Sequence, residues 1–224
     1  IGTTHYLGTN FGKAFNIIFL DKDGEMKYVH QTCYGPGISR IAAAIILLHG
    51  DRYGLVLPFD MAAVQVVIIP IPLKGVSQEE LKRYCEEVKD LLSAEGYRVK
   101  LDFSDRTPGE KFYNYDMLGV PVRIEVGGRE LKAGTVTVYR RDKREKVTIP
   151  REELVEYVRF LQGDILKYLR ERAEKRLEES IRDVETMDEF LQAVEDGVNI
   201  IRTGFCGGED CADEIKAMTG YEVR

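Results

Sequence analysis

One short run of residues has the composition of a ligand-binding turn. Gly35-Pro36-Gly37-Ile38-Ser39-Arg40 lies between an expected strand and an expected apolar helix. Glycine lets a ligand approach the backbone closely, and an arginine at a helix start can reach a phosphate with a fork of donors. The pattern therefore suits a phosphorylated ligand. A purely structural turn is the alternative, and the pattern alone favours it.

A second cluster combines cations with aromatic rings within one segment. Its members are Arg106, Lys111, Arg123, Phe112, Tyr113 and Tyr115. Readers of RNA loops stack splayed bases on aromatic rings and hydrogen-bond their edges from charged side chains, so this composition suits RNA recognition. An ordinary solvated surface has the same composition and is the commoner case. Asp102, Asp105 and Asp116 could accept from base amino groups or pair with the cations.

Cys206 and Cys211 are separated by Gly-Gly-Glu-Asp. Two thiolates at this spacing can occupy two positions of a tetrahedral zinc ion, but zinc needs four ligands and no further cysteine or histidine is nearby. Half a site is therefore present, and two incidental cysteines in an acidic loop are the alternative. Cys85 falls on a helix with apolar spacing and is expected in the core.

The composition is that of a soluble globular protein. The 224 residues are 44% hydrophobic and 31% charged, and no apolar run approaches the ~20 residues of a membrane helix. No export signal begins the chain, and four unequally spaced cysteines favour a reducing compartment, so we expect a cytoplasmic protein without a membrane segment. The net charges of residues 1–64, 65–150 and 151–224 are 0, +2 and −8. A nucleic-acid contact would therefore belong to the middle segment.

The elements that would position these residues follow from hydrophobic periodicity. Strands are expected at 15–20, 26–31, 64–71, 97–103, 120–126, 135–141 and 144–149. Helices are expected at 38–49, nearly all apolar and hence buried, at 78–95 behind a Ser77/Glu80 capping box, at 107–119, and at 151–183, charged and solvent-exposed. Strands alternating with helices predict a compact α/β unit with a mixed sheet, and 55–60 is the expected linker before it. The chain opens without methionine and stops without a turn signal, so we expect a fragment.

Three blocks in unbroken order resemble class II prolyl-tRNA synthetases. The first is Gly2-Thr3-Thr4-His5. The second is Cys33 to Arg40 with its run through Gly54-Leu55-Val56-Leu57-Pro58 and Gln65 to Pro70. The third comprises Arg106, Gly109, Lys111, Phe112, Asp116, Gly119, Pro121, Arg123 and Gly127. The resemblance covers nearly the whole chain, and three ordered blocks are far more specific than one.

The resemblance implies a role for each motif residue. Arg40 would contact the triphosphate of ATP as the catalytic arginine, and Thr3 would line the ATP site. His5 would contact proline, with Cys33 and Gly35 shaping its pocket and with Gly37 and Ser39 in the same motif. Arg106, Lys111, Phe112 and Arg123 would bind the anticodon.

The resemblance also implies cofactors, partners and domains. ATP with Mg²⁺, L-proline and tRNA(Pro) would be the substrates, and the intact enzyme would be a homodimer. Cys206 and Cys211 would hold a structural Zn²⁺ together with a second cysteine pair beyond Arg224. Residues 1–60 would end an antiparallel catalytic domain, 61–165 would form the anticodon-binding α/β domain, and 166–224 would begin an α-rich zinc-binding extension.

The sequence is therefore interpreted as part of a proline–tRNA ligase. The first two signature motifs of class II are absent from these residues, so this chain alone is not expected to catalyse. The rival hypothesis is a non-catalytic RNA-binding or regulatory protein that keeps the anticodon module. His5 and Arg40 argue against the rival, because neither has a use without a catalytic domain.

Overall fold

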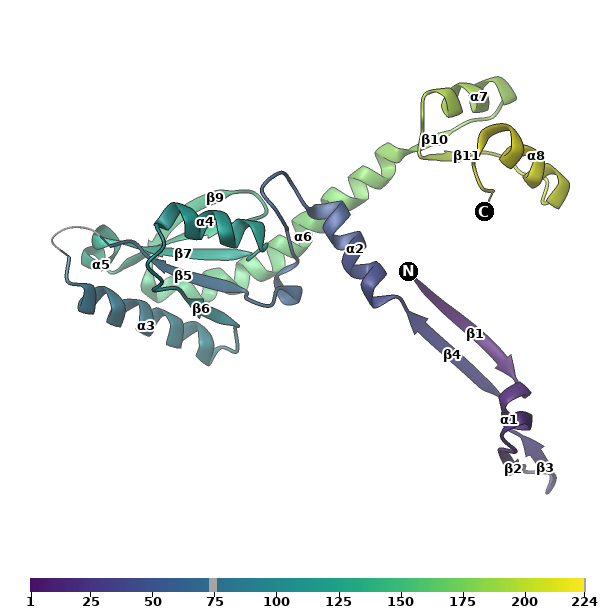
Figure 1. Ribbon diagram of the computed structural model, residues 1–224, viewed down its shortest axis with the longest axis horizontal. Coiled ribbons are helices and arrows are strands. Elements are labelled where there is room, and N and C mark those ends of the chain that lie inside the picture. Colours follow the sequence, from purple (N-terminus) through teal and green to yellow (C-terminus); the bar gives the residue numbers. More distant parts are fainter. Residues whose placement is uncertain (73–75, 224) are drawn as a thin grey trace. The chain divides into compact units, whose positions relative to one another are not determined.

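The computed structural model describes residues 1–72 and 76–223. They form two compact units, Ile1–Leu154 and Val155–Arg224. The strands of the first unit are β1 (Gly2–Gly8), β2 (Ile18–Leu20), β3 (Met26–Tyr28), β4 (Gln31–Pro36), β5 (Val66–Pro70), β6 (Val99–Leu101), β7 (Val122–Val126), β8 (Thr135–Arg140) and β9 (Glu145–Pro150). Its helices are α1 (Asn10–Ala14), α2 (Ile38–His49), α3 (Gln78–Ala94), α4 (Pro108–Met117) and α5 (Gly128–Ala133). Figure 1 traces these elements along the chain.

The mixed sheet predicted for the middle segment is present. Its strand order is β6-β5-β7-β8-β9, with β5 parallel to β6 and β7, and with β8 antiparallel to both of its neighbours. The crossover through α3 leads from β5 to β6, and the crossover through α4 leads back from β6 past β5 to β7. Because the two run in opposite directions across the sheet, right-handed connections place these helices on opposite faces of it (Figure 1). All five residues of β5 are buried, as expected for a strand covered on both faces.

The helix starts follow from capping. The Thr107 hydroxyl accepts a hydrogen bond from Glu110 N at 3.3 Å, and Glu110 Oε2 accepts one from Thr107 N at 2.8 Å, which completes a capping box at α4. At α3, Ser77 Oγ accepts from Glu80 N at 3.3 Å. Helix α5, a six-residue helix that begins after β7 and Gly127, was not expected from the sequence.

The N-terminal segment forms two antiparallel pairs, β1 with β4 and β2 with β3. Helix α2 has the predicted bounds, but the expectation that it is buried is wrong for the described residues. Ile38 is 76% exposed and Leu47 is 77% exposed, because no segment within residues 1–72 and 76–223 covers these side chains.

The expected linker at 55–60 is packed. Val56 and Phe59 are 2% and 1% exposed, and the Phe59 ring meets Tyr97 edge-on with 5.7 Å between centroids. The 3₁₀ turn Phe59–Met61 therefore belongs to the folded unit.

Helix α6 (Leu154–Ser180) begins at the boundary between the two units. The expectation that it is solvent-exposed is wrong for its first half. Leu154, Val158, Leu161, Ile165 and Leu169 recur every three or four residues and are fully buried, which is the stripe of an amphipathic helix. The frequent charges along this helix obscured that stripe in the sequence.

The second unit also contains β10 (Ile181–Asp183), α7 (Met187–Glu195), β11 (Ile200–Arg202) and α8 (Glu209–Thr219). β10 and β11 pair in parallel. Within residues 1–72 and 76–223, no helix has both the length and the apolarity to cross a bilayer.

Candidate functional site

The β1–β4 pair places four predicted site residues opposite one another. Thr3 pairs with Gly35, and His5 pairs with Cys33. Directly paired residues point to the same face of a sheet, and residues two apart do so as well. The four residues therefore share one face of a two-stranded platform, and all of them are exposed.

The platform leads directly into the first turn of α2. Gly37 N donates a hydrogen bond to Ile1 O at 2.7 Å, and a Cβ at position 37 would lie 2.8 Å from the same oxygen. Only glycine therefore fits this close approach of the two strand ends. Ser39 and Arg40 follow in the first helical turn and are exposed. Free backbone N–H groups and a guanidinium at this point are suited to an anion.

The five-stranded sheet has a polar surface on its α4 side. The register aligns Val67, Arg123, Tyr139 and Lys146 in one row across β5, β7, β8 and β9. The row is apolar only on β5, and there Val67 packs in a cluster with Ile69, Tyr115 and Val120. We call Phe112, Asp116, Arg123, Glu125, Tyr139 and Lys146 the polar face.

Arg123 lies at the centre of the polar face. Its guanidinium carbon is 4.1 Å from the Phe112 ring centroid and 3.9 Å from the Tyr139 ring centroid. Nη1 donates to Asp116 Oδ1 at 2.8 Å, and Nε donates to Glu125 Oε1 at 3.0 Å. Nη2 has no hydrogen-bond partner among the described residues.

These contacts fix the plane of the guanidinium before any ligand arrives. Two aromatic rings and two carboxylates hold it, and its terminal nitrogen keeps two donors for an acceptor. Lys146, 46% exposed in its side chain, adds a second cation through a 2.7 Å bond to Glu125 Oε2. Such an arrangement can read the O6 and N7 acceptors of guanine, while the half-buried Phe112 ring offers a stacking surface.

Lys111 and Arg106 do not join the polar face. Both line a separate cavity of about 430 Å³ at the carboxyl ends of β5 and β6. The Lys111 ammonium donates to Asp102 O at 3.0 Å and lies 3.7 Å from Asp102 Oδ1. The four predicted anticodon residues are therefore divided between two neighbouring places.

Two of the aspartates take the pairing role that the sequence left open. Asp116 pairs with Arg123, and Asp102 pairs with Lys111. Burial acts to raise the pKa of Asp102, but hydrogen bonds involving Ser104 and Tyr115, together with the Lys111 charge, hold that pKa below its usual value. Burial and the bond to Asp102 raise the pKa of Tyr115 to about 12, so its hydroxyl remains a donor at neutral pH.

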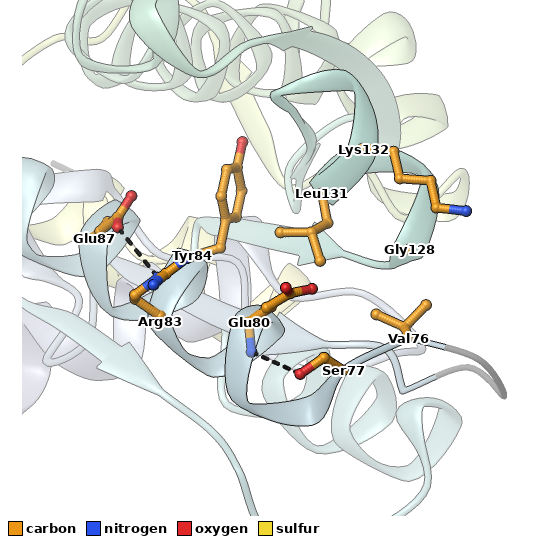
Figure 2. A pocket seen from close by; sticks show the side chains of 9 residues that line it. All are labelled: Val76, Ser77, Glu80, Arg83, Tyr84, Glu87, Gly128, Leu131 and Lys132. Carbon is orange, nitrogen blue, oxygen red and sulfur yellow. Dashed lines mark hydrogen bonds and ion pairs between the residues drawn. The ribbon is translucent and has the colours of Figure 1, made fainter.

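A further cavity of about 380 Å³ lies between α3 and α5, and Figure 2 shows its lining. Arg83 and Lys132 line it beside the carboxylates of Glu80 and Glu87. Arg83 pairs with Glu87 at 4.0 Å. No site residue predicted from the sequence lines this cavity, which we do not assign to the candidate site.

The predicted metal pair lies just before and within α8. Gly208 N donates to Cys206 Sγ at 3.4 Å. This bond, together with the Cys211 thiol, lowers the pKa of Cys206, whereas the Cys206 side chain raises the pKa of Cys211. Within the described ranges no group of three or more histidine, cysteine or acidic side chains could hold a metal. The two thiols therefore fit half of a tetrahedral zinc site.

Sequence reasoning missed Glu125, Tyr139 and Lys146. Their signal is the alternation on the strands. Val122, Ile124 and Val126 are buried on one face of β7, while Arg123 and Glu125 point to the other face. A polar residue at every second position of a central strand indicates a face that must be satisfied by partners.

Comparison with known proteins places these features in a family. The anticodon binding domain model matches residues 65–161, which contain the whole five-stranded sheet. The proline–tRNA ligase of Thermofilum pendens is 48% identical over 100% of this chain and 47% of its own length. The enzyme of the same name from Pyrococcus abyssi is 49% identical over 94% of this chain and 44% of its own length.

The comparison with solved structures agrees. A crystal structure of prolyl-tRNA synthetase from Cryptosporidium parvum, complexed with L-proline and AMP, matches with a TM-score of 0.85 and 39% identity. The match covers 98% of this chain and 47% of that one. Over nearly its whole length, the chain is similar to the C-terminal portion of class II prolyl-tRNA synthetases. It spans about half the length of the curated relatives that it matches.

The similarity to prolyl-tRNA synthetases confirms the resemblance seen in the three sequence blocks, and the mixed α/β fold class is confirmed with it. The polar face lies inside the matched anticodon-binding region. The β1–β4 platform lies outside that region, in the segment aligned with full-length synthetases.

Proposed function

We propose that this chain supplies the ATP-facing motif and the anticodon reader of an enzyme that activates L-proline with ATP and transfers it to tRNA(Pro). The observation that carries the proposal is the register of β1 with β4. It aligns Thr3, His5, Cys33 and Gly35 on one face, next to the turn that presents Arg40. The polar face belongs to the same compact unit.

Each platform residue has a proposed role. His5 and Cys33, side by side, form one wall of a small pocket for the proline ring. Thr3 and Gly35 face the nucleotide, and Gly37 and Ser39 shape the turn. Arg40 neutralises charge on the triphosphate, which enters with Mg²⁺ as part of the substrate. The relative from Cryptosporidium parvum, which has been crystallised with L-proline and AMP, supports this choice of ligands.

For the tRNA, we propose that Arg123 and Phe112 contact the anticodon bases. A proline anticodon presents two adjacent guanines, and the free Nη2 donors of Arg123 match guanine acceptors. Arg106 is exposed and contacts the RNA backbone beside them. Lys111 acts from the cavity wall and holds the β6–α4 loop through its bond to Asp102 O.

The most direct test of the reaction is proline-dependent exchange of pyrophosphate into ATP by the intact enzyme. We expect exchange with proline and little with alanine or cysteine. If no amino acid supports exchange while the protein still binds RNA, the rival RNA-binding hypothesis is correct.

The His5→Ala substitution should weaken the binding of proline more than the binding of ATP. His5 pairs with Cys33 at the expected proline wall, two residues along the strands from Thr3 and Gly35. We expect the KM for proline to rise at least about tenfold and the KM for ATP to change by less than about threefold, since one lost hydrogen bond in a small pocket costs about 1–3 kcal/mol. Separate titrations of the two substrates measure this difference. Equal effects on both would contradict the assignment, and His30→Ala, which alters a histidine outside the platform, is the control.

We also propose that Cys206 and Cys211 bind a structural Zn²⁺ together with two ligands from outside the described residues. The Gly208 N–H bond to Cys206 Sγ supports this, because it favours the thiolate that zinc requires. The intact protein should contain about one zinc per chain, with zinc–sulfur distances of about 2.3 Å.

Elemental analysis and X-ray absorption after purification without chelators check the zinc prediction. Cys206→Ser should lose the metal, whereas Cys85→Ser, which alters a fully buried thiol on α3, should keep it. A metal-free wild-type protein would remove the claim. We further propose a cytoplasmic homodimer, to be checked by light scattering of the intact enzyme.

A further inference from the structure

Arg141 is a buried side chain of the first unit with several hydrogen bonds, and none of the roles proposed above uses it. It follows β8 directly, and its side chain is 1% exposed. Nη1 and Nη2 donate to the two carboxylate oxygens of Asp51 at 2.8 and 2.6 Å, and Nε donates to Asp116 O at 3.1 Å. The backbone N of Arg141 donates to Pro121 O at 2.9 Å.

Asp51 stands two residues after the end of α2, the helix whose first turn presents Arg40. Its turn is tight, because Asp51 N donates to Gly54 O and Gly54 N donates back to Asp51 O. The next residue, Leu55, donates from its backbone N to Met117 O at 3.1 Å. Gly54 lies so near α4 that a Cβ there would be 2.3 Å from Met117 Cα.

Asp116 connects the same arginine to the polar face. Its backbone carbonyl accepts from Arg141, while its side chain accepts from Arg123. A continuous series of contacts therefore joins the end of α2 to the centre of the polar face through Asp51, Arg141 and Asp116. The planar fork of an arginine, bonded to both oxygens of one carboxylate, fixes orientation as well as distance.

We propose that Arg141 is a positioning residue that clamps the end of α2 to the polar face, so that a tRNA bound by its anticodon presents its acceptor end to the catalytic site. This inference rests on the proposed function. One tRNA must occupy two distant sites at the same time. Binding at one site raises the effective concentration of the tRNA at the other site. This gain is lost when the relative position of the two sites changes, even though each site alone is intact.

Loss of the Asp51–Arg141 ion pair should therefore affect one of three measurable properties of the intact enzyme and leave the other two unchanged. Asp51→Asn keeps the size of the side chain and removes the charge that Arg141 grips. We expect proline-dependent ATP–pyrophosphate exchange to stay within about twofold of wild type. The Kd of a hairpin RNA that carries only the proline anticodon arm should also stay within about twofold. The kcat/KM for charging full-length tRNA(Pro) should fall at least about tenfold, as for a misplacement remote from the chemistry.

Asp90→Asn is the matched control, since it changes an exposed aspartate on α3, and it should leave all three quantities unchanged. If Asp51→Asn fails to fold, Arg141→Lys, which keeps the charge but cannot grip both oxygens, decides by the same three measurements. Hairpin binding that weakens as much as charging would overturn the proposal, because Arg141 would then act only locally on α4. Unchanged charging would overturn it as well. A wild-type enzyme that charges no proline would instead reject the proposed function.

Discussion

Arg40→Ala in the intact enzyme should lower proline-dependent ATP–pyrophosphate exchange by about 100-fold or more. Arg40 is exposed in the first turn of α2, directly after the Gly37 turn that only glycine fits. In the proposed role, the Arg40 guanidinium stabilises charge that develops on the phosphates in the transition state, and removal of one such donor typically has an effect of this size. The effect should appear in kcat more than in the KM for ATP.

Arg170→Ala, which removes an exposed arginine from α6, is the control and should leave exchange unchanged. Arg40→Lys should recover only part of the rate, because an ammonium cannot donate two parallel bonds to one phosphate. Exchange near the wild-type rate in Arg40→Ala would mean that the turn has a purely structural role.

Arg123→Lys should lower kcat/KM for charging tRNA(Pro) while leaving ATP–pyrophosphate exchange unchanged. The substitution keeps a cation beside Asp116 and Glu125, so the buried acids remain compensated. It removes the planar fork held between the Phe112 and Tyr139 rings, and with it the Nη2 donors that we propose contact a base. The loss of a base contact corresponds to about 1–3 kcal/mol, or roughly 5- to 150-fold in kcat/KM.

Arg106→Ala tests the neighbouring cavity in parallel. The loss of a contact to the RNA backbone should weaken the binding of all tRNAs alike. The loss of a contact to a base should change the discrimination between anticodons. We expect the first result for Arg106 and the second for Arg123. The reverse result would move anticodon reading to the cavity at the carboxyl ends of β5 and β6.

The sequence predicted the sheet and its helices well because their signals are local. The unbroken β-branched run of β5 and the capping residues Ser77 and Thr107 lie in contiguous residues, and each element formed where it was expected. The pairing of His5 with Cys33 and of Thr3 with Gly35 has no such local signal. Strand register depends on the whole hairpin, so the sequence suggested these residues only through family resemblance.

Burial was the property that the sequence predicted least well. Helix α2 is nearly all apolar yet largely exposed in the described residues, and α6 is highly charged yet buried along one stripe. Burial depends on what lies opposite a face, which composition does not record. For the same reason Lys111 and Arg123, twelve positions apart, were expected together and lie in different environments, one against Asp102 and the other between two rings.

The central claim is that this chain reads the anticodon for a proline-charging enzyme. The most direct measurement is aminoacylation of two tRNA(Pro) transcripts with labelled proline by the intact enzyme, one native and one with its anticodon guanines replaced. We predict that the native transcript is charged with at least about tenfold higher kcat/KM in the wild type, and that Arg123→Lys reduces this ratio. Equal charging of both transcripts by the wild type, or no charging of either with proline, would contradict the claim.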